Sequence, residues 1–261
     1  MIVTTSNDET PELIERAKHL AKEMEANYFK RNKKTIDYLL QSVDAQIFVA
    51  NSQRGLSFYK EAGKEIFFHP NMAFLRIKQL EQGQKDSLVT VCGLREGMSF
   101  FDGTIGLASD ALVAAYAVGP TGKVIGTEAS RPLYYLTTFG LDFYQKNHPE
   151  WQEVISRIQI KNMGNLDLLK QLEPKSVDVV YFDFMFEKSI GSSSGIQVIK
   201  SITSEDSLTR EHIEEARRVA KSRIVAKSGY SGQPLQELGF TVEKAHKRRQ
   251  FYYGAIEIET L

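Results

Sequence analysis

The sequence predicts an α/β protein whose core is a mostly parallel sheet, and three observations support this fold class. Strands and helices alternate from Gly97 onward, which is the pattern of a doubly wound parallel sheet. An apolar strand stops at Asp102 and is followed by a small-residue loop, 103–108, and a helix at 110–118. The last two strands lie too close together for a crossover helix, so we expect them to form an antiparallel hairpin.

The second half of the chain contains seven predicted strands, at residues 98–102, 123–127, 154–160, 177–183, 222–227, 240–246 and 250–258. We expect the hairpin turn near residues 247–249 and a helix at 207–220. Ligands bind at the carboxyl ends of parallel strands. The residues that follow these strands are therefore the first candidates for a functional site.

The first part of the chain, residues 1–95, predicts a small α/β module, and residues 96–261 predict a nucleotide-binding domain. The module's predicted elements are a strand at 2–5, a charged helix from 11 to about 31, strands at 46–50, 56–59 and 65–68, and an amphipathic segment at 72–82. A capping and helix-start signal at residues 8–11 precedes the helix, whose apolar residues share one face. This module is a candidate for substrate recognition.

Composition excludes several classes of function. The 33 basic and 33 acidic residues leave no formal net charge, so any contact with nucleic acid has to be local. The single cysteine, Cys92, rules out an intrachain disulfide and is expected in the core. No signal peptide or apolar run of about 18 residues occurs, so we expect a soluble cytoplasmic protein without a membrane partner. The five histidines show no metal-ligand spacing, so we expect no metal.

The loop after the strand at 98–102 has the chemistry of a nucleotide site. Small residues such as Gly106 let the backbone approach a ligand, and the first free N–H groups of the next helix donate to it. The following strand ends at Glu128, whose carboxylate suits the two hydroxyls of an unmodified ribose. Because the loop lacks G-x-G-x-x-G, it favours S-adenosylmethionine over a nicotinamide dinucleotide. The alternative is an ordinary α/β domain with a glycine turn.

The strand at 177–183 gives a second chemical signal, because it ends in Asp183 at the same edge of the sheet. It runs into Phe184 and Phe186, and a polar segment rich in glycine and serine follows at 188–195. This segment either closes over a substrate or is an exposed linker.

Six segments together resemble the RsmJ family: DGTIGLASDAL at 102–112, TEAS at 127–130, VVYFDFMFEKS at 179–189, the helix at 207–220, RIVAKSGY at 223–230 and the ending at 246–253. That family consists of Rossmann-like class I methyltransferases that use S-adenosylmethionine to modify the exocyclic amino group of a guanine in small-subunit ribosomal RNA. The resemblance covers residues 97–261 in order. It is weaker over 1–96, where FFHPNMAFLRIKQL at 67–80 is closer to uncharacterised relatives.

The resemblance implies S-adenosylmethionine as cofactor and ribosomal RNA or the small ribosomal subunit as partner. Matched residue by residue, it implies a cofactor site made of Asp102, Gly106, Ser109, Asp110, Glu128, Ala129, Gly164, Asn165 and Asp183. Two positions depart from the family. Phe184 stands where the family has proline, which removes a rigid turn beside the target base. Ser109 stands where an arginine is usual, so one charged contact to the cofactor is missing.

The same match predicts the catalytic residues. Asp183 is expected to accept a hydrogen bond from the target amino group and to act as orienter or proton acceptor. Phe184 and Phe186 are expected either to stack on a base drawn out of its helix or to pack in the core.

Two basic features are candidates for RNA contact. Lys227 ends a strand at the same edge. We expect its side chain to contact phosphate, to contact a neighbouring carboxylate or to be solvated. A strongly basic segment that begins at Lys244 precedes aromatic residues, and we expect it either to contact RNA or to form a charged hairpin tip. It contains His246, Lys247, Arg248 and Arg249.

The leading hypothesis is a methyltransferase of ribosomal RNA that uses S-adenosylmethionine. A second hypothesis keeps the cofactor and changes the acceptor to a protein or a small molecule, which the zero net charge and Phe184 favour. A third is a protein that binds the cofactor without turnover. A nicotinamide oxidoreductase comes last.

Overall fold

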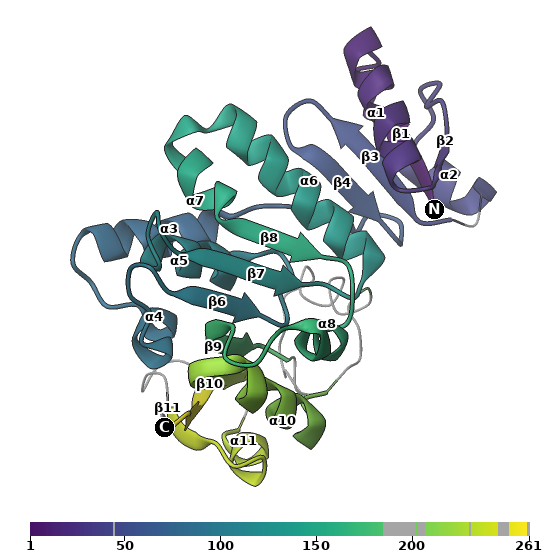
Figure 1. Ribbon diagram of the computed structural model, residues 1–261. Coiled ribbons are helices and arrows are strands. Elements are labelled where there is room, and N and C mark those ends of the chain that lie inside the picture. Colours follow the sequence, from purple (N-terminus) through teal and green to yellow (C-terminus); the bar gives the residue numbers. More distant parts are fainter. Residues whose placement is uncertain (44, 185–201, 203–206, 230, 245–250, 260–261) are drawn as a thin grey trace.

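The computed structural model describes residues 1–43, 45–184, 202, 207–229, 231–244 and 251–259. These residues form two sheets joined by helices (Figure 1). Within them, no helix is long and apolar enough to cross a membrane.

The larger sheet has seven strands in the order β11-β12-β10-β9-β6-β7-β8. Their bounds are Ser99–Asp102 for β6, Lys123–Thr127 for β7, Ile158–Lys161 for β8, Val177–Phe182 for β9, Ala220–Ser228 for β10, Thr241–Lys244 for β11 and Tyr252–Glu257 for β12. The five strands from β10 to β8 run parallel, whereas β12 is antiparallel to both β10 and β11. The predicted mostly parallel sheet with a terminal antiparallel hairpin is therefore confirmed, and the predicted turn at 247–249 lies outside the described residues.

Helices cover both faces of this sheet. One core cluster contains residues of α3 (Asn71–Glu81), α4 (Ser87–Cys92), α5 (Ser109–Ala117) and α7 (Gln152–Ser156). The cluster on the other face contains residues of α8 (Asn165–Gln171), α10 (Arg210–Val219) and α11 (Gln233–Glu237). Phe100 and Phe101 are neighbours in β6 and belong to different clusters, because successive side chains of a strand point to opposite faces.

The predicted strand at 154–160 is wrong in its first half. Val154 and Ile155 belong to the short helix α7, which follows the 3₁₀ turn η1 (Pro149–Trp151), and the strand β8 begins only at Ile158. Both residues are buried, and a short buried apolar run fits a helix as well as a strand.

The smaller sheet has the order β2-β1-β3-β4-β5. Its strands are Ile2–Thr5 for β1, Asn27–Tyr28 for β2, Ile47–Asn51 for β3, Gly55–Tyr59 for β4 and Glu65–Phe67 for β5. The first three are parallel, and the last two pair antiparallel to their neighbours. Two helices complete this part of the chain, α1 (Pro11–Glu23) and α2 (Ile36–Val43). The helix α2 and the strand β2 were not predicted from the sequence.

Helix α1 begins where the sequence predicts and ends earlier. The Thr10 hydroxyl accepts a hydrogen bond from the Leu13 amide at 3.2 Å, and Pro11 opens the helix. The helix stops at Glu23 rather than near residue 31, because Glu25 takes a left-handed conformation with φ of 50°.

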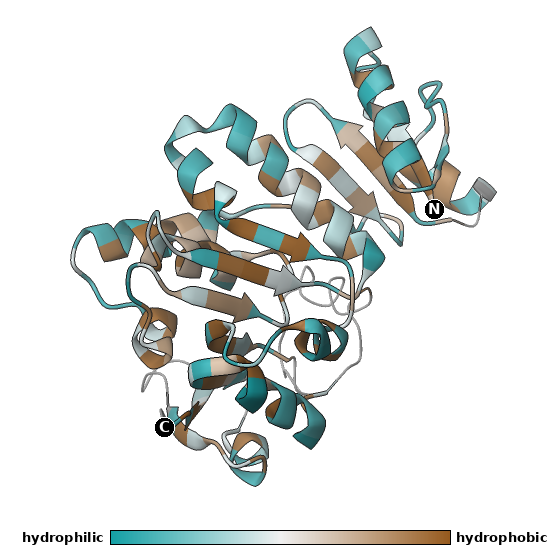
Figure 2. Ribbon diagram, in the orientation of Figure 1, coloured by the Kyte–Doolittle hydropathy of each residue, from teal (hydrophilic) through white to brown (hydrophobic). Residues whose placement is uncertain are grey.

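Hydrophobic residues gather on the strands β7 and β8, while the visible side of α1 is largely hydrophilic (Figure 2).

Helix α6 (Arg131–Asn147) joins the two sheets. Its residues Leu133 and Leu136 are fully buried in the core of the smaller sheet, on the face that α1 also covers. The Arg131 guanidinium donates to the Met24 carbonyl at 2.7 Å. Because α6 starts just after β7, it fixes the N-terminal module next to the carboxyl edge of the large sheet.

Candidate functional site

The loop between β6 and α5 is tied to the end of β9 through Thr104. The Thr104 amide and hydroxyl donate to Asp102 Oδ1 at 3.0 and 3.4 Å, and the Asp183 amide donates to Thr104 Oγ1 at 2.6 Å. Asp102 is only 1% exposed, and burial raises the pKa of its carboxyl to about 8. The Thr104 hydroxyl thus links the Asp102 carboxylate to the backbone of Asp183 at the carboxyl edge.

Glycines set how closely the backbone packs in this loop. A Cβ on Gly103 would lie 2.6 Å from the Phe182 ring, so a side chain there requires the ring to move. The Gly103 carbonyl accepts hydrogen bonds from Thr127 and Asn165, both at 3.1 Å, which joins the loop to the end of β7 and to α8. A Cβ on Gly106, with φ of +52°, would meet only the Thr104 carbonyl, at 3.9 Å, so the chain leaves room beside this glycine.

Glu128 follows β7 and is held by the backbone. Its Oε1 accepts from the Ser130 amide at 2.8 Å and its Oε2 from the Gly106 amide at 3.2 Å. Burial raises the pKa of the Glu128 carboxyl to about 7, although these two hydrogen bonds favour the charged form. The carboxylate is thereby fixed in orientation, and each oxygen retains a lone pair for a ligand hydroxyl.

Asp110 lies in the first turn of α5 and is engaged by three side chains. Its Oδ1 accepts from Arg76 at 2.6 Å, its Oδ2 accepts from the Tyr181 hydroxyl at 2.8 Å, and the Lys227 ammonium is 3.5 Å away. Burial opposes ionisation, but the charges of Lys227 and Arg76 lower the pKa of Asp110 to about 2. The cofactor contact at Ser109 and Asp110 stays a prediction, and this carboxylate already has protein partners.

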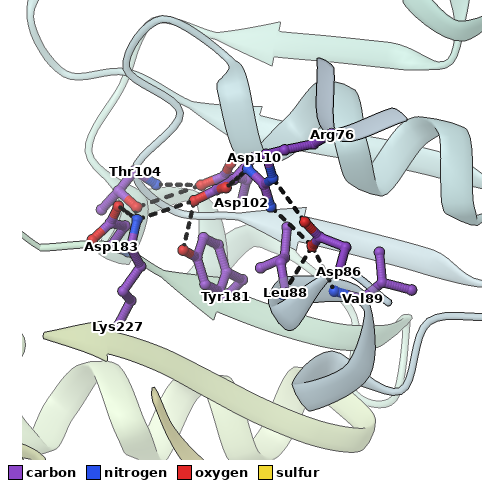
Figure 3. Close-up of polar contacts among 10 residues, drawn as sticks. All are labelled: Arg76, Asp86, Leu88, Val89, Asp102, Thr104, Asp110, Tyr181, Asp183 and Lys227. Atoms are coloured by element: carbon purple, nitrogen blue, oxygen red, sulfur yellow. Dashed lines mark hydrogen bonds and ion pairs between the residues drawn. The ribbon is translucent and has the colours of Figure 1, made fainter. Parts of the chain in front are cut away.

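Arg76 is a residue of this cluster that the sequence did not single out. From α3 it bridges Asp110 and Asp86, donating to both Asp86 oxygens at 2.8 and 3.0 Å (Figure 3). Asp86 also caps α4 by accepting from the amides of Leu88 and Val89. The signal that was available is a lone arginine three residues after the buried Ala73 on an otherwise apolar helix face.

Lys227 pairs directly with Asp183. Its Nζ donates to Asp183 Oδ2 at 2.6 Å, and the two side chains are 23% and 33% exposed. Burial raises the pKa of the Asp183 carboxyl, the Lys227 charge counteracts this, and nearby Asp110 adds to the rise. Of the alternatives that we considered for Lys227, the structure shows contact with a neighbouring carboxylate, and contact with RNA stays a prediction.

The remaining predicted residues fall into three groups. Gly164 and Asn165 lie at the start of α8, and Ala129 directly follows Glu128. Phe184 is only 7% exposed and packs against Phe182 and His212, with ring centroids 5.6 and 5.7 Å away. These contacts agree with the expected core packing, and stacking of Phe184 on a base stays a prediction. Five predicted residues lie outside the described part of the chain: Phe186, His246, Lys247, Arg248 and Arg249.

No metal centre is formed by the residues that the structure describes, since no group of three or more His, Cys, Asp or Glu side chains among them could hold an ion. The free thiol of Cys92 is buried, as expected of a core residue.

A seven-stranded sheet of this order, parallel except for β12, with a small-residue loop after β6 and an acid after β7, is the arrangement of a class I methyltransferase that uses S-adenosylmethionine. The chain belongs to the family described as "Putative SAM-dependent methyltransferase", which it matches over residues 39–253. A protein of Bacillus subtilis, the uncharacterized protein YpiP, is 38% identical over 98% of this chain and 99% of its own length.

Two further comparisons extend this result. The ribosomal RNA small subunit methyltransferase J of Marinobacter nauticus is 28% identical over 51% of this chain and 48% of the enzyme, which confirms the resemblance to the RsmJ family over about half of each protein. The crystal structure of a SAM-dependent methyltransferase from Neisseria gonorrhoeae superposes with a TM-score of 0.62 at 15% identity, covering 98% of this chain and 96% of that one. The fold of the whole chain is thus that of a Rossmann-like methyltransferase.

The residues at the carboxyl edge fit S-adenosylmethionine, the cofactor of this family. Glu128 presents a fixed, buried carboxylate at the end of β7, where a ribose is bound in such folds. The open space beside Gly106 leaves room for the backbone to approach a ligand. We therefore assign Glu128 to the ribose hydroxyls as a prediction, with the loop at 103–108 beneath the cofactor.

Proposed function

We propose that this protein methylates ribosomal RNA of the small subunit, with the exocyclic amino group of a guanine as the acceptor. The names of two relatives, ribosomal RNA small subunit methyltransferase J, support ribosomal RNA as the substrate. The guanine amino group is what the resemblance to the RsmJ family implies. The structural observation that supports it is the Asp183 carboxylate, which is partly exposed at the carboxyl edge and has one oxygen held by Lys227.

An exocyclic amine is a weak nucleophile, because its lone pair is delocalised into the ring. When bound, S-adenosylmethionine supplies a methyl carbon on a positively charged sulfur, which leaves with the electron pair of the carbon–sulfur bond. Asp183 Oδ2 is occupied by Lys227, so Oδ1 is the atom that accepts a hydrogen bond from the amine. That hydrogen bond orients the nitrogen, and positioning supplies much of the rate in such transfers.

Asp183 also suits the second half of the reaction. A nitrogen that gains a methyl group has to lose a proton, and Asp183 Oδ1 would receive it and pass it to water. Burial raises the pKa of this carboxyl, which makes it a better proton acceptor, while the charge of Lys227 favours its ionised form.

One specific observation favours the second candidate function, a different acceptor. Phe184 replaces the family's proline and is buried between Phe182 and His212. A buried phenylalanine in place of the family's proline changes the residue next to Asp183, which supports an acceptor other than the family's.

The test is transfer of labelled methyl from S-adenosylmethionine to three acceptors in parallel: unmodified small ribosomal subunits, naked ribosomal RNA and a protein extract. The control pair is Asp183→Asn and Asp142→Asn, the second of which removes an exposed carboxylate paired with Lys146. Label in RNA that disappears only in the Asp183 variant supports the proposal. Label only in protein assigns a different acceptor, and no label despite cofactor binding assigns a binding protein.

A further inference from the structure

The loop between β2 and α2 concentrates positive charge in a chain whose net charge is zero. Lys30, Arg31, Lys33 and Lys34 lie within five consecutive residues, and no acid occurs between Tyr28 and Ile36. We call Lys30, Lys33, Lys34 and Tyr38 the basic loop surface. Such a local concentration is what a neutral protein needs in order to attract a polyanion.

Among the described residues, the cations of this surface have no carboxylate partners. Elsewhere on the molecule, Lys18, Lys64 and Lys146 each lie 2.6 to 2.7 Å from a glutamate or aspartate oxygen. By contrast, no ion pair within the described ranges forms at any of the four cations of the loop, and the Arg31 guanidinium donates to backbone carbonyls. The charge of Glu9 acts on Arg31 from a distance. The three lysines form no ion pair within the part of the protein that the structure describes, so their charge stays available to a ligand.

The loop has a fixed shape. Arg31 is 6% exposed, and its guanidinium bonds the carbonyls of Lys34 and, at 3.5 Å, Thr5. The Lys34 amide donates back to the Arg31 carbonyl at 3.0 Å. Between them, Asn32 and Lys33 take left-handed backbone conformations, with φ of 49° and 57°. Residues with a Cβ rarely adopt this conformation. The turn holds Lys30 and Lys33 exposed on its outside.

Aromatic rings stand beside these charges. The Lys34 ammonium lies 5.4 Å from the centroid of the Phe29 ring and 5.0 Å from that of Tyr38. The Tyr38 side chain is among the most exposed large hydrophobic groups described, at 51%. An exposed ring next to unpaired cations is the combination that binds single-stranded RNA, since the cations meet phosphates and the ring stacks on a base.

This surface lies apart from the methyl-transfer site. Strand β2 is an edge strand, and α2 packs on the face of the smaller sheet opposite to the one that α6 covers. In Figure 1, both elements lie on the outer side of the N-terminal module, away from the seven-stranded sheet. A ligand that contacts both places has to be large.

We propose that the basic loop surface binds single-stranded RNA, with Lys30, Lys33 and Lys34 on phosphates and Tyr38 stacked on a base. The identity of that RNA as part of the ribosomal substrate rests on the proposed function, whereas binding itself does not. The surface holds a part of the RNA that is remote from the methylated nucleotide.

Binding is measured by fluorescence anisotropy with a labelled single-stranded oligoribonucleotide of mixed sequence at several KCl concentrations. The double variant Lys30→Gln/Lys33→Gln should bind at least fivefold more weakly. The slope of log affinity against log salt should fall by about 1.4, which is about 0.7 for each phosphate that the variant no longer neutralises. Tyr38→Ala should weaken binding about tenfold, while Tyr38→Phe, which keeps the ring, should stay within about twofold of the parent.

The matched control is Lys78→Gln/Lys85→Gln, which removes the same charge from two exposed lysines outside the N-terminal sheet. Equal losses in the two double variants would show a general charge effect and overturn the proposal, as would a parent that does not bind the oligonucleotide. Binding to vesicles of anionic phospholipid but not to RNA would assign the surface to a membrane instead.

Methyl transfer is measured on the same variants. If the parent methylates RNA and the loop variants bind and methylate RNA as the parent does, the proposed function stands. The proposal that the basic loop surface binds RNA is then wrong. If the parent methylates only protein while the loop variants lose RNA binding, the surface stands and the proposed acceptor is wrong.

Discussion

The Lys227 ammonium lies 2.6 Å from Asp183 Oδ2 and 3.5 Å from Asp110 Oδ2. One positive charge therefore serves two partly buried carboxylates that come from different elements, α5 and the end of β9. The proximity of Asp110 raises the pKa of Asp183, and Lys227 opposes that rise.

Lys227→Met should lower the rate constant of methyl transfer by about 10²-fold and move the acid limb of its pH profile to higher pH. Without the ammonium, burial and Asp110 raise the pKa of Asp183 further, so a higher pH is needed to ionise it. Lys227→Arg should retain most of the activity. The control is Lys221→Met, which removes a similar ion pair with Asp178, 3.4 Å apart, at the other end of the same strands. This variant should leave the pH profile unchanged. A Lys227→Met profile like that of the parent would refute the role of Lys227 in holding the pKa of Asp183 down.

Asp183→Ala should bind S-adenosylmethionine within about threefold of the parent and lose between about 10² and 10⁴ in turnover. The backbone amide of residue 183, which bonds Thr104, remains in this variant. Calorimetric titration with the cofactor and single-turnover kinetics measure the two effects separately. A large loss of cofactor affinity would instead make Asp183 a binding residue.

Glu128→Ala should weaken cofactor binding between about tenfold and a hundredfold, because the ribose loses its acceptor. The parent's affinity should also rise about tenfold between pH 6 and pH 8, since a carboxyl with a pKa of about 7 is only about a tenth ionised at pH 6. Glu128→Gln should show a flat profile. Titration at both pH values decides this, and an alanine variant that binds like the parent would place the ribose elsewhere.

Asp102→Asn should become more stable relative to the parent as the pH rises from about 4 to about 8. Burial raises the pKa of Asp102 from 3.8 to about 8, so in this window the native parent holds a proton that the unfolded chain has released. The parent's free energy of unfolding therefore falls with rising pH, whereas asparagine does not titrate. Urea unfolding at pH 5 and pH 8 measures the difference, and an equal effect of the substitution at both values would contradict it.

Arg76→Met should destabilise the protein by about 3 to 5 kcal/mol, because it removes the cation that pairs with both Asp86 and Asp110 in a largely buried cluster. Arg76 is 19% exposed and contacts both acids at 2.6 to 3.0 Å. Arg54→Met removes a more exposed pair with Glu65 and should cost less than about 1 kcal/mol. Urea unfolding compares the losses of unfolding free energy in the two variants. Similar losses would mean that the Arg76 cluster is solvated.

The sequence predicted the acids of the site because each follows a readable strand. Asp102, Glu128 and Asp183 come directly after apolar runs or close them, and the parallel arrangement then brings them to one edge. Arg76 and Tyr181 were beyond reach, because they are 34 and 71 residues from Asp110 and meet it only through tertiary packing. No local pattern records such a contact.

Short elements were also difficult to predict from the sequence. The helix α7 has five residues, too few for its periodicity to differ from that of a strand. Extending α1 to residue 31 placed Lys30 and Arg31 on a solvated helix surface and hid the basic loop surface. The left-handed Glu25 that ends the helix has no glycine or proline to mark it.

Helix α6 has a consequence for how the chain is made. The smaller sheet is complete once Phe67 has been synthesised, but Leu133 and Leu136, which cover part of one face, follow only with α6. At about 5 to 20 residues per second, the nascent sheet waits on the order of ten seconds with that part of the face uncovered, while α1 already covers the rest. The N-terminal module therefore completes its core only after the first strands of the larger sheet have been synthesised.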